Sequence, residues 1–203
     1  DLEIRGAGNL LGGEQSGHIA DVGFDLYVRL VGEAVAEFRG GGTPEETGPA
    51  ETRIELPIDA HLPHDYVPSE RLRLEMYKRL AELTSDEDVT SIRDELEDRY
   101  GAPPAPVASL LQVARFRARS RSAGVGEVTV QGRYIRFAPV DLPDSRAVRL
   151  GRLYPKSILK PNLRTMLVPR PTTLVVGGSP LRDEELLAWA TQVIETVLGE
   201  PQP

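Results

Sequence analysis

The amino-acid sequence predicts an α+β fold: a helix-rich first half, a small antiparallel sheet and a closing C-terminal helix, preceded by a glycine loop and one amphipathic helix. Between residues 69 and 123, apolar residues recur every three or four positions, which is the spacing of one helix face. From residue 126 the period changes to the alternation of half-buried strands, and residues 182–198 return to helical spacing. This segregation of helices and strands is typical of α+β domains.

The chain begins with a glycine-rich loop and one helix that point to a missing neighbour. Five of the first seventeen residues are glycines, and no initiator Met or targeting signal precedes them, so we expect a loop cut from a larger protein. Residues 24–39 predict an amphipathic helix of about four turns. Residues 40–51 are rich in glycine and proline and predict a flexible linker. The predicted units are therefore 1–39, the linker 40–51 and a domain over 52–203.

The domain opens with an edge strand and an irregular segment. Residues 52–58 alternate apolar and polar side chains, and Pro57 restricts such a strand to a sheet edge. His61 and His64 follow beside two aspartates, and imidazole with carboxylate is a common ligand set for zinc or iron. No HExxH helix is present and Pro63 separates the two imidazoles, so a surface loop is favoured over a metal site.

Three helices follow, each with a start signal. Ser69 can cap a helix over 70–83, and Ser85 can cap a helix over 87–100 that the next glycine ends. A proline cluster starts a third helix within 103–123. All three carry an apolar stripe and should pack on a common core.

The second half predicts strands and a final helix. Residues 126–138 predict a hairpin with a glycine at its turn, and residues 165–168 and 173–176 predict further strands. Residues 147–159 fit a short helix or an extended crossing equally well. Residues 182–198 predict the closing helix, because acidic residues in the first turn complement the helix dipole.

Charge is distributed unevenly along the chain. The net charge is −7, but residues 37–102 carry −9 and residues 103–182 carry +11. We expect these blocks to be partly satisfied by docking on one another and partly solvated. The chain has no cysteine and no apolar run long enough to span a membrane, which favours a cytoplasmic protein without membrane contact.

The third helix ends in an arginine cluster formed by Arg115, Arg117, Arg119 and Arg121. Guanidinium groups suit phosphate or carboxylate partners, so this is a candidate face for an anionic partner. An acidic protein, or the chain's own acidic helices, is favoured over DNA because exposed aromatics are scarce here.

No catalytic centre is recognisable. The chain lacks a phosphate-binding GxxxxGK[ST] loop, a GxSxG elbow and an HExxH helix. Gly6, Gly8 and Gly12 miss the GxGxxG spacing by one residue, and no strand precedes them, which argues against a dinucleotide site. The sequence therefore predicts no catalytic residue, metal or cofactor within this chain.

Two separate stretches carry a family resemblance. The first is Arg5 to Gly17, in which Arg5 and Gln15 lie ten residues apart among glycines. It resembles the second half of the translocation motif of the RecG and Mfd DNA motors, and Ala7, where RecG sequences typically have proline, favours Mfd. Residues 62–101 are similar to the C-terminal domain of the bacterial transcription-repair coupling factor (Mfd) family, which RecG lacks.

The resemblance implies the C-terminal part of an ATP-dependent double-stranded DNA translocase, with helicase-type lobes, that displaces stalled RNA polymerase and recruits UvrA in nucleotide excision repair. ATP and magnesium would belong to the parent motor, and this chain alone should be inactive. Within the family motif, Arg5 and Gln15 couple nucleotide-driven lobe movement to the grip on duplex DNA. The motif maps here to Arg5, Gly6, Gly8, Gly12, Gln15 and Gly17.

The resemblance also implies that the C-terminal domain is autoinhibitory. It would dock on the N-terminal UvrA-binding module of the same protein, and the family's acidic docking residue falls on Glu95. Two alternatives stay open for Glu95: a solvated helix residue, or a partner of the basic block over 103–182. A different function, an independent protein- or nucleic-acid-binding adaptor, would use the arginine cluster.

Overall fold

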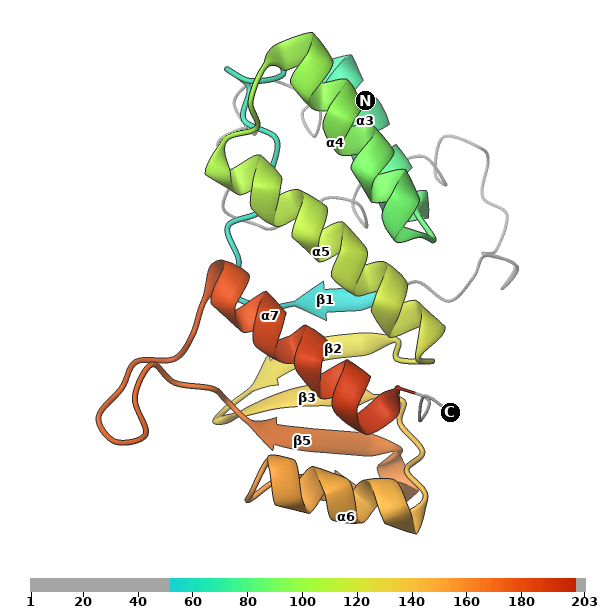
Figure 1. Cartoon of the computed structure of the whole chain (residues 1–203), viewed down its shortest axis with the longest axis vertical. Helices are drawn as coiled ribbons and strands as arrows, with labels where there is room; N and C mark the ends of the chain where they lie inside the picture. The colour runs from blue at the N-terminus through green and yellow to red at the C-terminus, as the bar shows by residue number, and fades with distance from the viewer. Residues whose placement is uncertain (1–51, 200–203) are drawn as a thin grey trace, which may run out of the picture.

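A five-stranded sheet and a set of covering helices form the part of the chain that the computed structural model describes, residues 52–199 (Figure 1). The glycine loop, the helix over 24–39 and the linker over 40–51 lie outside the described residues. In Figure 1, α3 and α4 form one end of the molecule and the sheet with α6 forms the other. Helices α5 and α7 contact each other and lie across the sheet between these ends (Figure 1).

The sheet has the order β1-β2-β3-β5-β4. Its strands are β1 (Arg53–Glu55), β2 (Glu127–Gln131), β3 (Tyr134–Ala138), β4 (Ile158–Lys160) and β5 (Thr165–Pro169). Strands β2 to β5 pair antiparallel, as expected, whereas β1 pairs parallel with β2, with Ile54 opposite Val128. The sheet is therefore mixed. β1 lies at an edge, as predicted, but it is shorter than the predicted strand over 52–58 and ends before Pro57.

The helices predicted over 70–83, 87–100, 103–123 and 182–198 are confirmed, with bounds that differ by one or two residues. They are α3 (Glu70–Glu82), α4 (Asp86–Tyr100), α5 (Ala105–Ser122) and α7 (Asp183–Val193), which continues as the π-helical turn η2 (Ile194–Leu198). A further helix, α6 (Asp144–Leu153), lies between β3 and β4. The Ser69 hydroxyl accepts a hydrogen bond from the Leu72 N–H, and the Ser85 hydroxyl accepts one from the Asp88 N–H. Both serines are therefore N-caps. Gly101 ends α4 with a φ of +86°, a conformation that favours glycine.

One predicted strand is wrong, and one open alternative is resolved. Residues 173–176 are not a strand: they form a turn in the segment between β5 and α7, and their side chains are exposed. The apolar run resembles a strand in sequence, but no strand within residues 52–199 pairs with it. Residues 147–159 contain both structures that were considered, the end of α6 and then β4, followed by the short 3₁₀ helix η1 (Pro161–Leu163).

The core lies between the sheet and the helices. Its fully buried side chains come from α3, α4, α5, the inner face of the sheet and the closing helix, and include Leu80, Leu96, Val107, Leu110, Phe116, Val128, Ile135, Phe137, Met166, Leu186 and Val193. Burying each large aliphatic or aromatic side chain stabilises the fold by about 1.5–3 kcal/mol. Because α5 supplies residues to both ends of the core, the α3–α4 pair is held on the sheet through α5.

Candidate functional site

Glu95 lies in the third turn of α4, on the side that faces α3. Helix α4 forms because Ser85 caps it, three acidic residues occupy its first turn, and an apolar stripe faces the core. Leu96, in that stripe, is fully buried, and its neighbour Glu95 is consequently placed at the border between core and solvent, with 33% of its side chain exposed.

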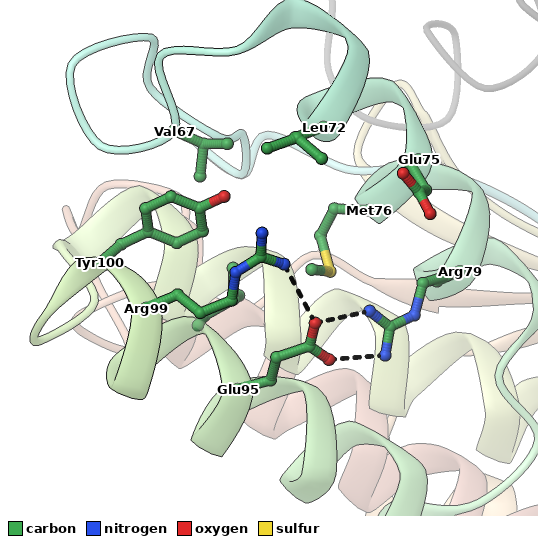
Figure 2. A pocket seen from close by; sticks show the side chains of 9 residues that line it. Val67, Leu72, Glu75, Met76, Arg79, Glu95, Arg99 and Tyr100 are labelled. Carbon is green, nitrogen blue, oxygen red and sulfur yellow. Dashed lines mark hydrogen bonds and ion pairs between the residues drawn. The ribbon is translucent and has the colours of Figure 1, made fainter.

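Two arginines hold the Glu95 carboxylate. Both of its oxygens accept from Arg79 of α3, with Oε1 3.1 Å from Nη1 and Oε2 2.8 Å from Nη2 (Figure 2). Arg99, one turn along α4, donates to Oε1 from 3.4 Å. This bidentate pair is geometrically specific and charge-assisted, while the Arg99 contact is long and weak. Glu95 therefore joins α3 to α4 through both oxygens, and Oε1 accepts a second, weaker bond from Arg99.

The pairing changes the acidity of both partners. The hydrogen bond from Arg79 is the main reason that the pKa of the Glu95 carboxyl lies below its ordinary value, and the pKa of Arg79 is raised by the same bond. Glu95 is consequently ionised at neutral pH and presents a permanent negative charge in this cluster.

A pocket of about 260 Å³ adjoins the pair between α3 and α4 (Figure 2). Met76 and Leu96 line it as apolar residues, Arg79 and Glu95 line it as a charged pair, and the Tyr100 ring lies at the other side. The pocket is thus a mixed apolar and charged depression that could receive a side chain of another protein surface.

Tyrosines fix the end of α4 next to this pocket. The Tyr66 hydroxyl donates to the Gly101 carbonyl from 2.8 Å, and its ring lies 5.6 Å from that of Tyr100. The Arg99 guanidinium carbon is 5.4 Å from the centre of the Tyr100 ring, within cation–π range. These contacts hold Arg99 close to Glu95.

The partners of Glu95 correct one sequence-based alternative. Neither Arg79 nor Arg99 belongs to the basic block over 103–182, so the hypothesis that Glu95 pairs with that block is wrong. Arg99 could have been inferred from its i,i+4 spacing. Arg79 lies sixteen residues away and meets Glu95 only because two helices pack together.

The arginine cluster at the end of α5 does not form one open face. Arg117 is buried, with 5% of its surface exposed, and Arg115 donates to the Thr90 hydroxyl of α4 from 3.1 Å. Arg119 pairs with Asp86 of α4 at 3.1 Å and Glu195 of η2 at 2.7 Å. The chain's own acidic segments therefore occupy part of the cluster, including Arg119, as the sequence had suggested they could.

The remaining candidates contribute no recognisable chemistry. His61 Nδ1 lies 2.8 Å from Asp59 Oδ1, and His64 is exposed. Within residues 52–199, no group of three or more His, Asp or Glu side chains is arranged to hold a metal ion. Nor is any helix there long and apolar enough to cross a membrane. Arg5, Gly6, Gly8, Gly12, Gln15 and Gly17 lie outside the described residues.

Comparison with known proteins identifies the family. A sequence model of the TRCF domain matches residues 56–147, which include α3, α4, Glu95 and both of its arginine partners. The transcription-repair-coupling factors of Mycobacterium bovis and Mycobacterium tuberculosis are 47% identical over 211 aligned residues that cover all of this chain. The chain belongs to the transcription-repair coupling factor family.

The chain matches only a part of the length of these relatives. The chain spans 17% of the two mycobacterial proteins, and 66% of it aligns with 12% of the Staphylococcus haemolyticus transcription-repair-coupling factor at 42% identity. A crystal structure of the C-terminal domain of transcription-repair coupling factor matches 75% of this chain and 97% of its own, with a TM-score of 0.55 and 18% identity. This likeness supports the α+β fold of this family's C-terminal domain.

Proposed function

We propose that this chain is the C-terminal regulatory part of a cytoplasmic ATP-dependent DNA translocase that acts in transcription-coupled repair. In this proposal, ATP, magnesium and duplex DNA are bound by the parent motor. The domain over 52–203 docks on the UvrA-binding module of the same protein and covers it until RNA polymerase is engaged. Membership of a family named for coupling transcription to repair supports the general role.

The observation that carries the regulatory role is the state of the Glu95 carboxylate. It is ionised, one-third exposed and held in fixed geometry by Arg79 beside a pocket. A carboxylate fixed in this way loses little side-chain entropy on binding, so it is well suited to meet an arginine of a docked module. The docking arginine would replace Arg99. The contact of Arg99 with Glu95, at 3.4 Å, is weaker than that of Arg79 with Glu95.

Glu95→Ala in the full-length protein tests the proposal. Removing the carboxylate should weaken docking, expose the covered surface and raise the affinity for purified UvrA by about tenfold, the effect of losing one charge-assisted contact. Arg99→Ala should act in the opposite direction, because it removes the competitor for the same oxygen. Affinity is measured by titrating labelled UvrA with each variant.

Glu97→Ala is the matched control. Glu97 is an exposed acidic residue on the same helix, and its side chain has no ion pair within residues 52–199. It should leave UvrA affinity unchanged. If Glu95→Ala and Glu97→Ala bind UvrA equally well while both remain folded, Glu95 has no role in covering the UvrA-binding surface.

A further inference from the structure

The end of the molecule that holds α6 and β4 carries a strong positive charge. Residues 145–164 contain six basic residues and no acidic one. Residues 69–101, which form α3, α4 and their caps, contain ten acidic residues and six basic ones. In Figure 1, α6 and the α3–α4 pair lie at opposite ends of the molecule. The described domain is therefore positive at one end and negative at the other.

Five cations at the positive end have no acidic partner within residues 52–199, and we define them as the α6–β4 surface. They are Arg146, Arg149, Arg152, Lys156 and Lys160. Arg152 lies in the last turn of α6, Lys156 in the turn that follows, and Lys160 at the end of the edge strand β4. These last three side chains are exposed, so an external partner can reach them.

Contacts with η2 hold two of these cations without neutralising them. Arg146 and Arg149 each donate to a backbone carbonyl of η2 from 3.2 Å. A carbonyl carries no net charge, so both guanidinium groups remain positive. Glu195, the acidic residue of η2, is occupied by Arg119 of α5. The packing of η2 on α6 therefore leaves the positive charge in place.

The acidic residues nearest in sequence also leave this charge in place. Asp141 pairs with Arg164, which is not part of the α6–β4 surface. Asp144 lies in the first turn of α6, and Arg152 lies eight residues later, about 12 Å along the helix. Salt screens exposed charges beyond about 8 Å at physiological ionic strength, so Asp144 offsets little of the charge at Arg152.

The composition of the α6–β4 surface fits the phosphates of duplex DNA. A duplex carries one negative charge per about 1.7 Å of its axis, and arginine and lysine side chains contact phosphates without help from aromatic residues. Lysine is depleted at protein–protein interfaces, so Lys156 and Lys160 argue against an acidic protein as the partner. Val148 and Leu163 are exposed nearby, at 72% and 68%, but aliphatic residues scattered singly are normal on protein surfaces.

We infer that the α6–β4 surface binds the sugar–phosphate backbone of duplex DNA without reading its sequence. The family name also favours DNA, since transcription and repair both act on duplex DNA. Phosphates attract the positive end of the domain and repel the negative end, so DNA orients the domain with α6 toward it. The Glu95 pocket lies between α3 and α4, at the end away from the DNA (Figure 1). DNA binding here is therefore separate from docking through Glu95.

Fluorescence anisotropy of this chain with a short labelled DNA duplex tests the inference. If the surface neutralises about four phosphates, the logarithm of the affinity should fall with the logarithm of salt concentration with a slope of about −3.6. That slope corresponds to a loss of roughly 150-fold between about 50 and 200 mM salt. A duplex of unrelated sequence should bind equally well, because the backbone carries no sequence information.

Two matched double variants locate the contact. Arg152→Gln with Lys156→Gln should weaken binding at low salt by about tenfold or more and make the slope shallower by about 1.8. Arg71→Gln with Lys78→Gln removes one arginine and one lysine from exposed positions on α3 that have no ion pair within residues 52–199. This second variant, and Glu95→Ala, should change the affinity for DNA less than about twofold.

The variants must unfold at the same temperature as the parent chain, so that a loss of binding reports on the surface and not on the fold. Four results would overturn the inference: no binding of the duplex at low salt, binding that does not weaken with salt, equal losses in the two double variants, or binding of labelled poly-glutamate without binding of the duplex. The last result would identify an acidic protein as the partner.

Discussion

At the scale of single residues, the main feature is a carboxylate that pairs across two helices and is also partly exposed. Arg79 and Glu95 join α3 to α4 through a bidentate pair, and the same carboxylate faces solvent beside a pocket. Because a third of the Glu95 side chain is exposed, water screens the pair and limits its contribution to stability. The pair therefore contributes little to the stability of the fold.

The depressed pKa of Glu95 gives a pH-dependent prediction. Glu95→Gln should lower the free energy of unfolding at pH 7 by about 0.5–1 kcal/mol. The contribution of Glu95 is present above its ordinary pKa of 4.5 and is lost as pH falls through the lower pKa of the folded state, so the two proteins should converge there. Urea unfolding between pH 7 and pH 3 measures this. Glu97→Gln, which breaks no ion pair within residues 52–199, should show no such convergence.

At the scale of elements, α4 depends on its ends. The Ser85 hydroxyl lies 3.2 Å from the Asp88 nitrogen at the start, and Gly101 ends the helix with positive φ. Glu95 and Arg99 face their partners only if the last turns remain helical. The caps at Ser85 and Gly101 therefore keep Glu95 and Arg99 in place, although neither cap belongs to the candidate site.

Removing the N-cap should destabilise the chain. Ser85→Ala should lower the free energy of unfolding by about 1 kcal/mol, because an N–H in the first turn loses its acceptor. Ser85→Asp should restore most of it. Ser91→Ala is the control within the same helix: Ser91 is exposed and mid-helical, so alanine should be neutral or slightly stabilising. Equal losses at both serines would show that capping is not the cause. Thermal or urea unfolding gives these values.

At the scale of the whole molecule, Arg119 links three separate helical segments. From α5 it pairs with Asp86 at the start of α4 and with Glu195 in η2. Acidic blocks at 37–102 and 183–203 thus meet the basic block between them, in one place at the surface. The link tightens the contact of α5 with both of its neighbours without entering the core.

The Arg119 link should depend on salt. Arg119→Leu should cost about 1 kcal/mol of unfolding free energy at low ionic strength and much less in 1 M salt, where charges are screened within about 3 Å. Arg152→Leu on α6 is the control, because Arg152 is exposed and has no ion pair within residues 52–199. If the loss of unfolding free energy in Arg119→Leu does not change with salt, the cause would be packing by the aliphatic stem of Arg119 instead.

The sequence by itself determined the fold class, the helices α3, α4, α5 and α7, the hairpin of β2 and β3, both serine caps and the family. These features depend on local periodicity, capping chemistry and motifs. Each of these signals lies within a short stretch of sequence. It placed β1 at an edge because Pro57 cannot donate a ladder hydrogen bond. The same local reasoning failed at 173–176, where β-favouring residues have no strand to pair with in the part of the chain that the structure describes.

Only the tertiary structure decided which charges meet. Arg79 reaches Glu95, and Arg119 reaches Glu195 from seventy-six residues away, because helix packing brings distant side chains within hydrogen-bond range. The burial of Arg117, the parallel pairing of β1 and the exposure of residues 174–176 have the same origin. Each depends on which surfaces remain free once the core has formed, and that is a property of the whole packed molecule.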